Sequence, residues 1–219
     1  AHETAHLWFG SMVNLKNPEE EWAEEILTNF MASKITRRQY AKADHDLNFI
    51  RTYQAQAMPV DRTEGTHPIA MPPDQLDHTT MLNDPIDYNK SAVMMRMLED
   101  IMGANSMQNG IRNFLRNYYL KEASWDDLLA VLDKEAPTAG VRQFSKVWVH
   151  QKGMPVIHTT YKDGQLIISQ TDPFGRGLSW RQKFDVFIIF NLGSSRTIDV
   201  DMQQPIMTFK LRGKPSFII

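Results

Sequence analysis

The sequence lacks cysteine entirely across its 219 residues. Disulfide frameworks and thiolate metal sites are therefore excluded, and any metal must be held by histidine and carboxylate side chains. The sequence also has no apolar run near the roughly 18 residues that a membrane-spanning helix needs, and no signal-peptide pattern at its start. We expect no membrane contact from this segment, and its compartment stays open.

The sequence also has no excess of either charge. It contains 24 Lys+Arg and 26 Asp+Glu, for a formal net charge of -2, which gives no electrostatic reason to expect a nucleic-acid partner. Hydrophobic residues make up 42% and charged residues 23%, as is usual for globular proteins. The length fits one large domain or two modest ones.

The first part of the chain has a helical pattern. Apolar residues recur at helical spacing at Leu7, Trp8 and Met12, and again from Ile26 to Met31, with the loop "NLKNPEEE" between them. Residues 58–87 carry five prolines and little periodicity, which predicts a long ordered loop. Further helices are predicted in "DYNKSAVMMRMLEDIMG", "SMQNGIRNFLRNYYL", "SWDDLLAVLDKEA" and "VRQFSKVWVHQKG".

After Gly153 the pattern changes from helical to alternating. Asp163-Gly164 lies between two strand-like runs, which is a strong hairpin signal. "FDVFIIFNL" and "PIMTFKLRG" continue the β pattern, and the apolar ending "SFII" is more typical of an interior strand than of a solvated tail. The predicted fold class is α+β, with a helical domain over residues 1–153 and a β domain over residues 154–219.

The segment "HETAH" at the start of the sequence contains candidate metal-binding and catalytic residues. His2 and His6 are four residues apart, so on a helix both imidazoles lie on one face, within reach of a single ion, with Glu3 on the same turn. Imidazoles can bind zinc, zinc acidifies a bound water, and a nearby carboxylate can take the proton as that water attacks a carbonyl. The alternative is a chance match of a short motif, with the histidines simply at the surface.

A catalytic zinc needs a third protein ligand, and the acidic run "PEEEWAEEI" offers five glutamates. If the helix that contains Trp22 packs against the motif helix, Glu21 and Glu25 project from one face, and Glu19 and Glu20 lie nearer the solvated start. An ordinary charged helix face remains the alternative for the glutamates that do not bind metal.

Five segments in order, "HETAHLWFGSMVNLK", "WAEEI", "THPI", "DYNKSAVMMRML" and "WVHQKGMPVI", resemble landmarks of the zinc aminopeptidase family of gluzincins, of the aminopeptidase N, puromycin-sensitive aminopeptidase and leukotriene A4 hydrolase type. The resemblance implies a thermolysin-like helical catalytic subdomain followed by part of a small β-sandwich. It implies one zinc ion per chain, held by His2, His6 and Glu25, with peptides as substrates. Glu3 would be the general base, and Tyr88 in "YNKSA" would stabilise the transition state. His67 matches a landmark and is interpreted, with Pro68, as a residue that shapes its loop.

The chain also departs from that family. Around the third ligand the family has asparagine, glutamate, glycine and an aromatic residue, whereas this chain has Glu24, Glu25, Ile26 and Leu27. An isoleucine there could crowd the site or simply reflect divergence. A carboxylate at Glu24 would add negative charge near the zinc and could raise the pKa of its water.

The family's segment that binds the substrate's amino terminus is absent, as are its amino-terminal β domain and its carboxy-terminal helical domain. The resemblance therefore predicts an interior fragment of a larger enzyme, whose partners include the remaining parts of its parent chain. Three alternatives stay open: a catalytically impaired member that acts as a zinc-containing scaffold or receptor, an epoxide hydrolase side activity, and a helical interaction module with a chance motif.

Overall fold

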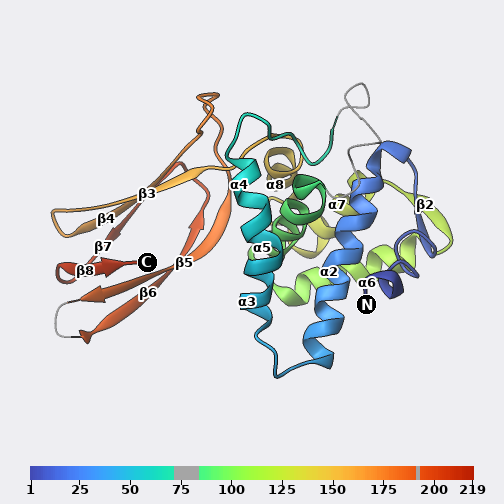
Figure 1. Cartoon of the computed structure of the whole chain (residues 1–219), viewed down its shortest axis with the longest axis horizontal. Coiled ribbons are helices and arrows are strands. Elements are labelled where there is room, and N and C mark those ends of the chain that lie inside the picture. The colour runs from blue at the N-terminus through green and yellow to red at the C-terminus, as the bar shows by residue number, and fades with distance from the viewer. Residues whose placement is uncertain (72–83, 191–192) are drawn as a thin grey trace. The chain divides into compact units, whose positions relative to one another are not determined.

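The structure is a computed structural model that describes residues 1–71, 84–190 and 193–219. The chain divides into two compact units, Ala1–Gly153 and Met154–Ile219. The first unit is mainly helical and the second is built from antiparallel sheets, as Figure 1 shows. The α+β fold class predicted from the sequence is confirmed.

Helices form most of the first unit. In chain order they are α1 (His2–Ala5), η1 (Pro18–Glu20), α2 (Glu21–Gln39), α3 (His45–Phe49), η2 (Ile50–Gln54), α4 (Ala55–Asp61), η4 (Ile86–Lys90), α5 (Ser91–Met102), α6 (Ala104–Asn117), α7 (Trp125–Glu135) and α8 (Val141–Trp148). None of the helices in the described part of the chain is long and apolar enough to cross a membrane.

The C-terminal end of α5 and the N-terminal end of α7 follow directly from the local sequence. Helix α5 stops at Gly103, which adopts a φ of +86°, a value that glycine tolerates better than other residues. Helix α7 begins with a capping box, in which Ser124 accepts from the backbone of Asp127 and the Asp127 carboxylate accepts from the backbone of Ser124. Apolar faces of α2, α5, α6 and α7 bury Ile26, Leu98, Met107, Leu132 and their neighbours in one core.

The motif helix is shorter than its apolar pattern predicts. It ends at Ala5 rather than continuing through Met12, because the chain next forms strand β1 (Val13–Leu15), which pairs in parallel with β2 (Lys121–Ala123). Gly10 has a φ of +102°, which is incompatible with a continuing helix. Leu7, expected on the apolar helix face, is 61% exposed.

The proline-rich segment is less irregular than predicted. Its beginning, Met58–Asp61, belongs to α4, and its end, Ile86 and Asp87, belongs to the π-helix η4. Residues 62–71 are irregular, as expected for a loop. Residues 72–83, which carry the rest of the predicted loop, lie outside the described residues.

Two three-stranded antiparallel sheets form the second unit, with strand orders β3-β4-β7 and β6-β5-β8. Their strands are β3 (Val156–Lys162), β4 (Gln165–Thr171), β5 (Gln182–Phe190), β6 (Ser195–Met202), β7 (Ile206–Lys210) and β8 (Pro215–Ile218). Asp163 and Gly164 join β3 to β4 with φ values of +50° and +76°, as a type I′ hairpin turn requires. The predicted hairpin is therefore present.

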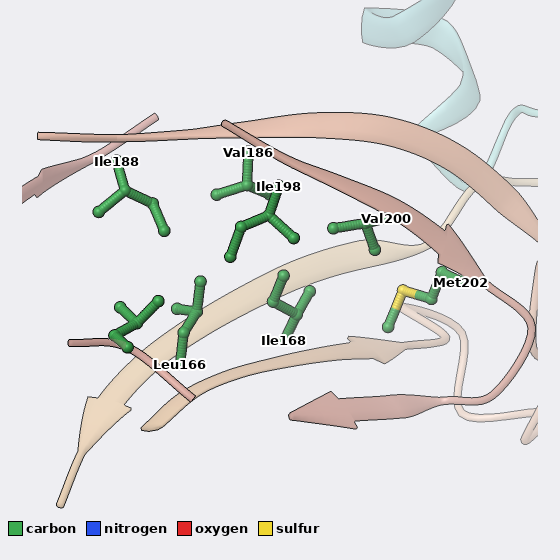
Figure 2. Packing of buried hydrophobic residues seen from close by; sticks show 8 residues of the cluster. Leu166, Ile168, Val186, Ile188, Ile198, Val200 and Met202 are labelled. Atoms are coloured by element: carbon green, nitrogen blue, oxygen red, sulfur yellow. The ribbon is translucent and has the colours of Figure 1, made fainter. Parts of the chain in front are cut away.

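Side chains from both sheets share one apolar core. Leu166 and Ile168 on β4 point toward Val186, Ile198 and Val200 on β5 and β6 (Figure 2). This face-to-face packing is that of a small β-sandwich. The final apolar segment, predicted to be an interior strand, is instead the edge strand β8, where Phe217 is 66% exposed.

Candidate metal centre

His2 is the first residue of α1 and His6 is its C-cap residue, so the two imidazoles project from the same helical turn. The two ring centroids are 4.8 Å apart and the ring planes cross at 85°. The two Nε2 atoms lie 3.2 Å from one another. Both histidines are half-buried, so the short motif helix does place two nitrogen donors side by side.

Glu25 brings its carboxylate to the same point from α2. Its Oε2 lies 3.5 Å from Nε2 of His2, and its Oε1 lies 3.4 Å from Nε2 of His6. Tetrahedral zinc with bonds of about 2.0 to 2.1 Å separates its ligand atoms by about 3.3 to 3.4 Å. The separations among the three side chains are close to that spacing, so these residues could hold a zinc ion.

Outer contacts orient the two imidazoles. Nδ1 of His2 lies 2.9 Å from Oδ1 of Asn29, and Nδ1 of His6 lies 3.2 Å from the carbonyl oxygen of Phe9. Both oxygens only accept hydrogen bonds, so each Nδ1 carries the proton and each Nε2 keeps its lone pair for a metal. Metal-ligating histidines are usually held in this way.

Glu24 lies on the outer side of this cluster. Its Oε1 is 3.4 Å from Nδ1 of His6, on the side of the ring away from the Nε2 donors. Burial raises the pKa of Glu24, the charge of His6 lowers it, and that of Glu25 raises it. A Cβ atom at Gly10 would lie 1.8 Å from Oε1 of Glu24, so another residue at this position would require the Glu24 carboxylate to move.

The isoleucine that replaces the family's glycine lies in the core. Ile26 is 0% exposed, whereas the neighbouring Glu25 turns toward α1. Of the two alternatives, divergence is therefore favoured over crowding of the donors.

Glu3 and the remaining glutamates of the acidic run differ in their surroundings. Glu3, Glu19 and Glu21 are exposed, and Glu3 sits on α1 between the two histidines in sequence. Glu20 is half-buried, and its Oε2 accepts a hydrogen bond of 2.8 Å from the backbone N–H of Trp125. Glu20 therefore stabilises the positive end of α7 rather than lying free in solvent.

Tyr88 lies on η4, which packs against α2. Its side chain is half-buried, and burial raises the pKa of the phenol, as do the negative charges of Glu25 and Glu21. A raised pKa keeps the hydroxyl protonated near neutral pH, so that it can donate a hydrogen bond. Tyr88 and Glu25 thus lie on two elements, η4 and α2, that pack against one another.

Lys90 fixes the end of η4. Its ammonium group is buried and donates to Oδ1 of Asp61 at 3.0 Å and to the carbonyl oxygen of Gly153 at 3.1 Å. Thr66 also donates to the same oxygen of Asp61, at 2.7 Å. Because breaking a buried ion pair leaves an uncompensated charge, these contacts hold the helix that carries Tyr88 in place.

Comparison with known proteins identifies the family of the helical unit. Residues 1–148 match the peptidase family M1 domain, which is more than half of the chain. The chain belongs to peptidase family M1. The M1 match ends close to Gly153, the last residue of the helical unit.

Named relatives of this M1 chain include aminopeptidases from archaea and plants. It is 31% identical over 167 residues to "Tricorn protease-interacting factor F2" of Thermoplasma volcanium, covering 76% of this chain and 21% of the relative. It is 29% identical over 170 residues to "Probable aminopeptidase 2" of Sulfurisphaera tokodaii, covering 78% and 22%. With "Aminopeptidase M1" of Arabidopsis thaliana, the identity is 28% over 171 residues, covering 78% and 19%. The chain thus spans about a fifth of the length of these relatives.

A cavity of about 470 Å³ lies beside His2 in the helical unit. Among the described residues it is lined by His2 and Asn29 from the site, and by Arg37, Arg96 and Glu99 farther away. His6 and Glu25 do not line it. The cavity therefore borders the Nδ1 side of His2 and not the point where the donors converge.

Sequence reasoning missed the residues that orient the ligands of this M1 chain. Asn29 follows Glu25 by four residues on α2, and Thr28, whose Oγ1 lies 3.4 Å from Nδ1 of His6, follows Glu24 by four. Residues four apart share a helix face. A search for polar residues four positions after Glu25 would have found Asn29, and the same search from Glu24 would have found Thr28.

Proposed function

We propose that this chain forms part of the catalytic core of a zinc-dependent aminopeptidase, which hydrolyses amino-terminal residues from peptides. The observation that carries the proposal is the convergence of two Nε2 atoms and one carboxylate at mutual separations of 3.2 to 3.5 Å. The names of the relatives support cleavage at the amino terminus.

His2, His6 and Glu25 would hold the zinc ion. When bound with an open fourth position, zinc acidifies a water molecule and polarises a carbonyl group. Two neutral imidazoles and one carboxylate leave a net positive charge on a divalent ion, which favours that chemistry. Asn29 and the Phe9 carbonyl keep both imidazoles in the tautomer that binds metal.

Glu3 and Tyr88 would act on the substrate. Glu3 is exposed on the turn that carries the two histidines, so its carboxylate is free to take the proton from the attacking water and pass it to the leaving amine. Tyr88, kept protonated by burial and by Glu25, would donate to the oxygen that becomes negative as the carbonyl is attacked. A donor placed where charge develops stabilises the transition state more than the ground state.

Metal removal from the full-length protein tests the proposal directly. We expect the protein to cleave a chromogenic amide of an unblocked amino acid, to lose this activity after dialysis against a chelator, and to regain it with one equivalent of Zn²⁺. The N-acetylated form of the same reporter is the matched control and should not be cleaved. A protein that binds zinc but cleaves neither reporter would contradict the proposal and favour the scaffold alternative.

The Tyr88→Phe variant tests the second role. Loss of one oxyanion donor typically lowers kcat by roughly 100- to 1,000-fold, so we expect a loss of that size with an unchanged KM and unchanged zinc content. Tyr40→Phe, at a tyrosine that is 64% exposed, is the control and should behave as the native protein. A kcat equal to the native value would remove Tyr88 from the mechanism.

A further inference from the structure

A second group of metal-binding side chains lies outside the zinc centre. His67, Asp84 and Asp87 each offer a ligand atom, and these atoms all lie within 4.8 Å of one another. His67 is on the irregular segment after α4, Asp84 precedes η4, and Asp87 is inside η4. Three residues from two segments therefore converge at the start of the helix that carries Tyr88.

His67 is oriented as metal-binding histidines are. Its Nδ1 lies 2.7 Å from the carbonyl oxygen of Pro68, which can only accept, so this nitrogen carries a proton. Its Nε2 lies 3.1 Å from Oδ2 of Asp84. Two donors about 2.1 Å from a shared ion lie roughly 3.0 to 3.4 Å apart, depending on the coordination angle. The pair therefore fits adjacent positions around one ion.

Both oxygens of Asp84 have defined contacts. Its Oδ1 accepts a hydrogen bond of 2.6 Å from the backbone N–H of Ile86. Its other oxygen, Oδ2, faces His67. The first bond fixes the carboxylate against the start of η4, and the second oxygen is thereby presented to the cluster.

Asp87 supplies the observation that points to a ligand. It is only 7% exposed, and its Oδ1 has no hydrogen-bond partner among the described residues. A buried carboxylate oxygen without a partner is costly, and a second carboxylate close by increases that cost. A bound cation would satisfy the oxygen and neutralise both acids.

We propose that His67, Asp84 and Asp87 bind a divalent first-row transition ion of the Mn²⁺ type. One imidazole nitrogen and two carboxylate oxygens form a donor set dominated by oxygen, which suits Mn²⁺, whereas imidazole-rich sites suit Zn²⁺. The ion is structural: it links the segment after α4 to the start of η4. This proposal goes beyond the aminopeptidase function and does not depend on it.

Manganese titration of the full-length protein tests the site. The zinc centre is first filled with one equivalent of Zn²⁺, and Mn²⁺ is then added while the electron paramagnetic resonance signal of the free aqueous ion is followed. We expect one Mn²⁺ to bind per chain, and its affinity to fall at least about tenfold in Asp87→Asn, which loses a charged ligand but keeps the side-chain shape. Asp126→Asn, at an aspartate whose side chain is 82% exposed, is the matched control and should bind as the native protein does.

Two further proteins separate this site from the zinc centre. His67→Gln should lose Mn²⁺ as Asp87→Asn does, which keeps the test decisive if one variant fails to fold. Glu25→Ala should still bind Mn²⁺ with native affinity, even though its zinc centre is damaged. The proposal is overturned if the native protein binds no Mn²⁺, which would mean that the buried Asp87 carboxyl is protonated instead. It is also overturned if the Mn²⁺ affinity is unchanged in both Asp87→Asn and His67→Gln.

Discussion

The Glu3→Gln variant is expected to bind zinc as the native protein does and to cleave aminoacyl substrates roughly 100- to 10,000-fold more slowly, the range that a positioned general base contributes. Glutamine has nearly the shape of glutamate but cannot accept the proton of the attacking water. The two histidines and Glu25, which form the donor cluster, are untouched by this change. The loss should therefore appear in kcat, with zinc content and KM close to the native values.

The measurement is a pair of assays on the full-length protein. Zinc is quantified by elemental analysis after dialysis against metal-free buffer, and steady-state hydrolysis of an unblocked aminoacyl reporter gives kcat and KM. Glu19→Gln, an identical substitution at another exposed glutamate, is the control and should retain native activity. Native turnover in the Glu3→Gln variant would refute the assigned base, whatever its zinc content.

The Glu25→Ala variant is expected to lose zinc. Its carboxylate reaches both Nε2 atoms, and its removal leaves the two imidazoles of the cluster without this third donor. Loss of an outer-shell partner typically costs about 10- to 100-fold in metal affinity, and loss of a ligand should exceed that. We expect the zinc affinity, measured by competition with a chromophoric chelator, to fall by more than this range, and hydrolysis to fall with it.

The neighbouring residue provides the matched control for Glu25. Glu24 has the same side chain on the same helix but contacts His6 at Nδ1, where the Phe9 carbonyl also accepts. Glu24→Ala should therefore bind zinc with an affinity within about 10-fold of the native value, at the mild end of outer-shell effects. Equal losses in the two variants would mean that Glu25 is not a ligand.

The candidate zinc ligands were predictable because the information is local or has fixed spacing. His2 and His6 are four residues apart, and residues at that spacing meet on one helical turn. Spacing alone left Glu21 and Glu25 as equivalent candidates, and the choice of Glu25 depended on the family resemblance. In the structure Glu25 contacts both histidines whereas Glu21 is exposed, so Glu25 stays the candidate for the third ligand.

The lengths of some elements were not predictable, because partners far along the chain decide them. The apolar pattern of Leu7, Trp8 and Met12 fits a helix, but Val13 pairs with Lys121, which is more than a hundred residues later. Strand pairing and the positive φ of Gly10 end the helix early. Where local pattern and tertiary pairing compete, tertiary pairing can win.

The cluster around His67 could not be predicted for the same reason. His67 with Pro68 was interpreted as shaping its loop, and the bond from Nδ1 to the Pro68 carbonyl agrees with that interpretation. Its other contact is with Asp84, 17 residues away, and no spacing rule links the two. Only the packing of η4 against α4 reveals that Asp87 is buried beside them.

The π-helical form of η4 makes the count of residues matter as much as their identity. A π-turn bonds residue i to i+5 and so contains one more residue than an α-turn, and η4 continues directly into α5. Each residue of an α-helix turns the chain by about 100°. Insertion or deletion of a single residue between Tyr88 and Ser91 would therefore rotate the side chains of Asp87 and Tyr88 relative to α5. Both residues would keep their identity but lose their present neighbours. An alignment that places these residues without regard to one-residue gaps would compare side chains that face different directions.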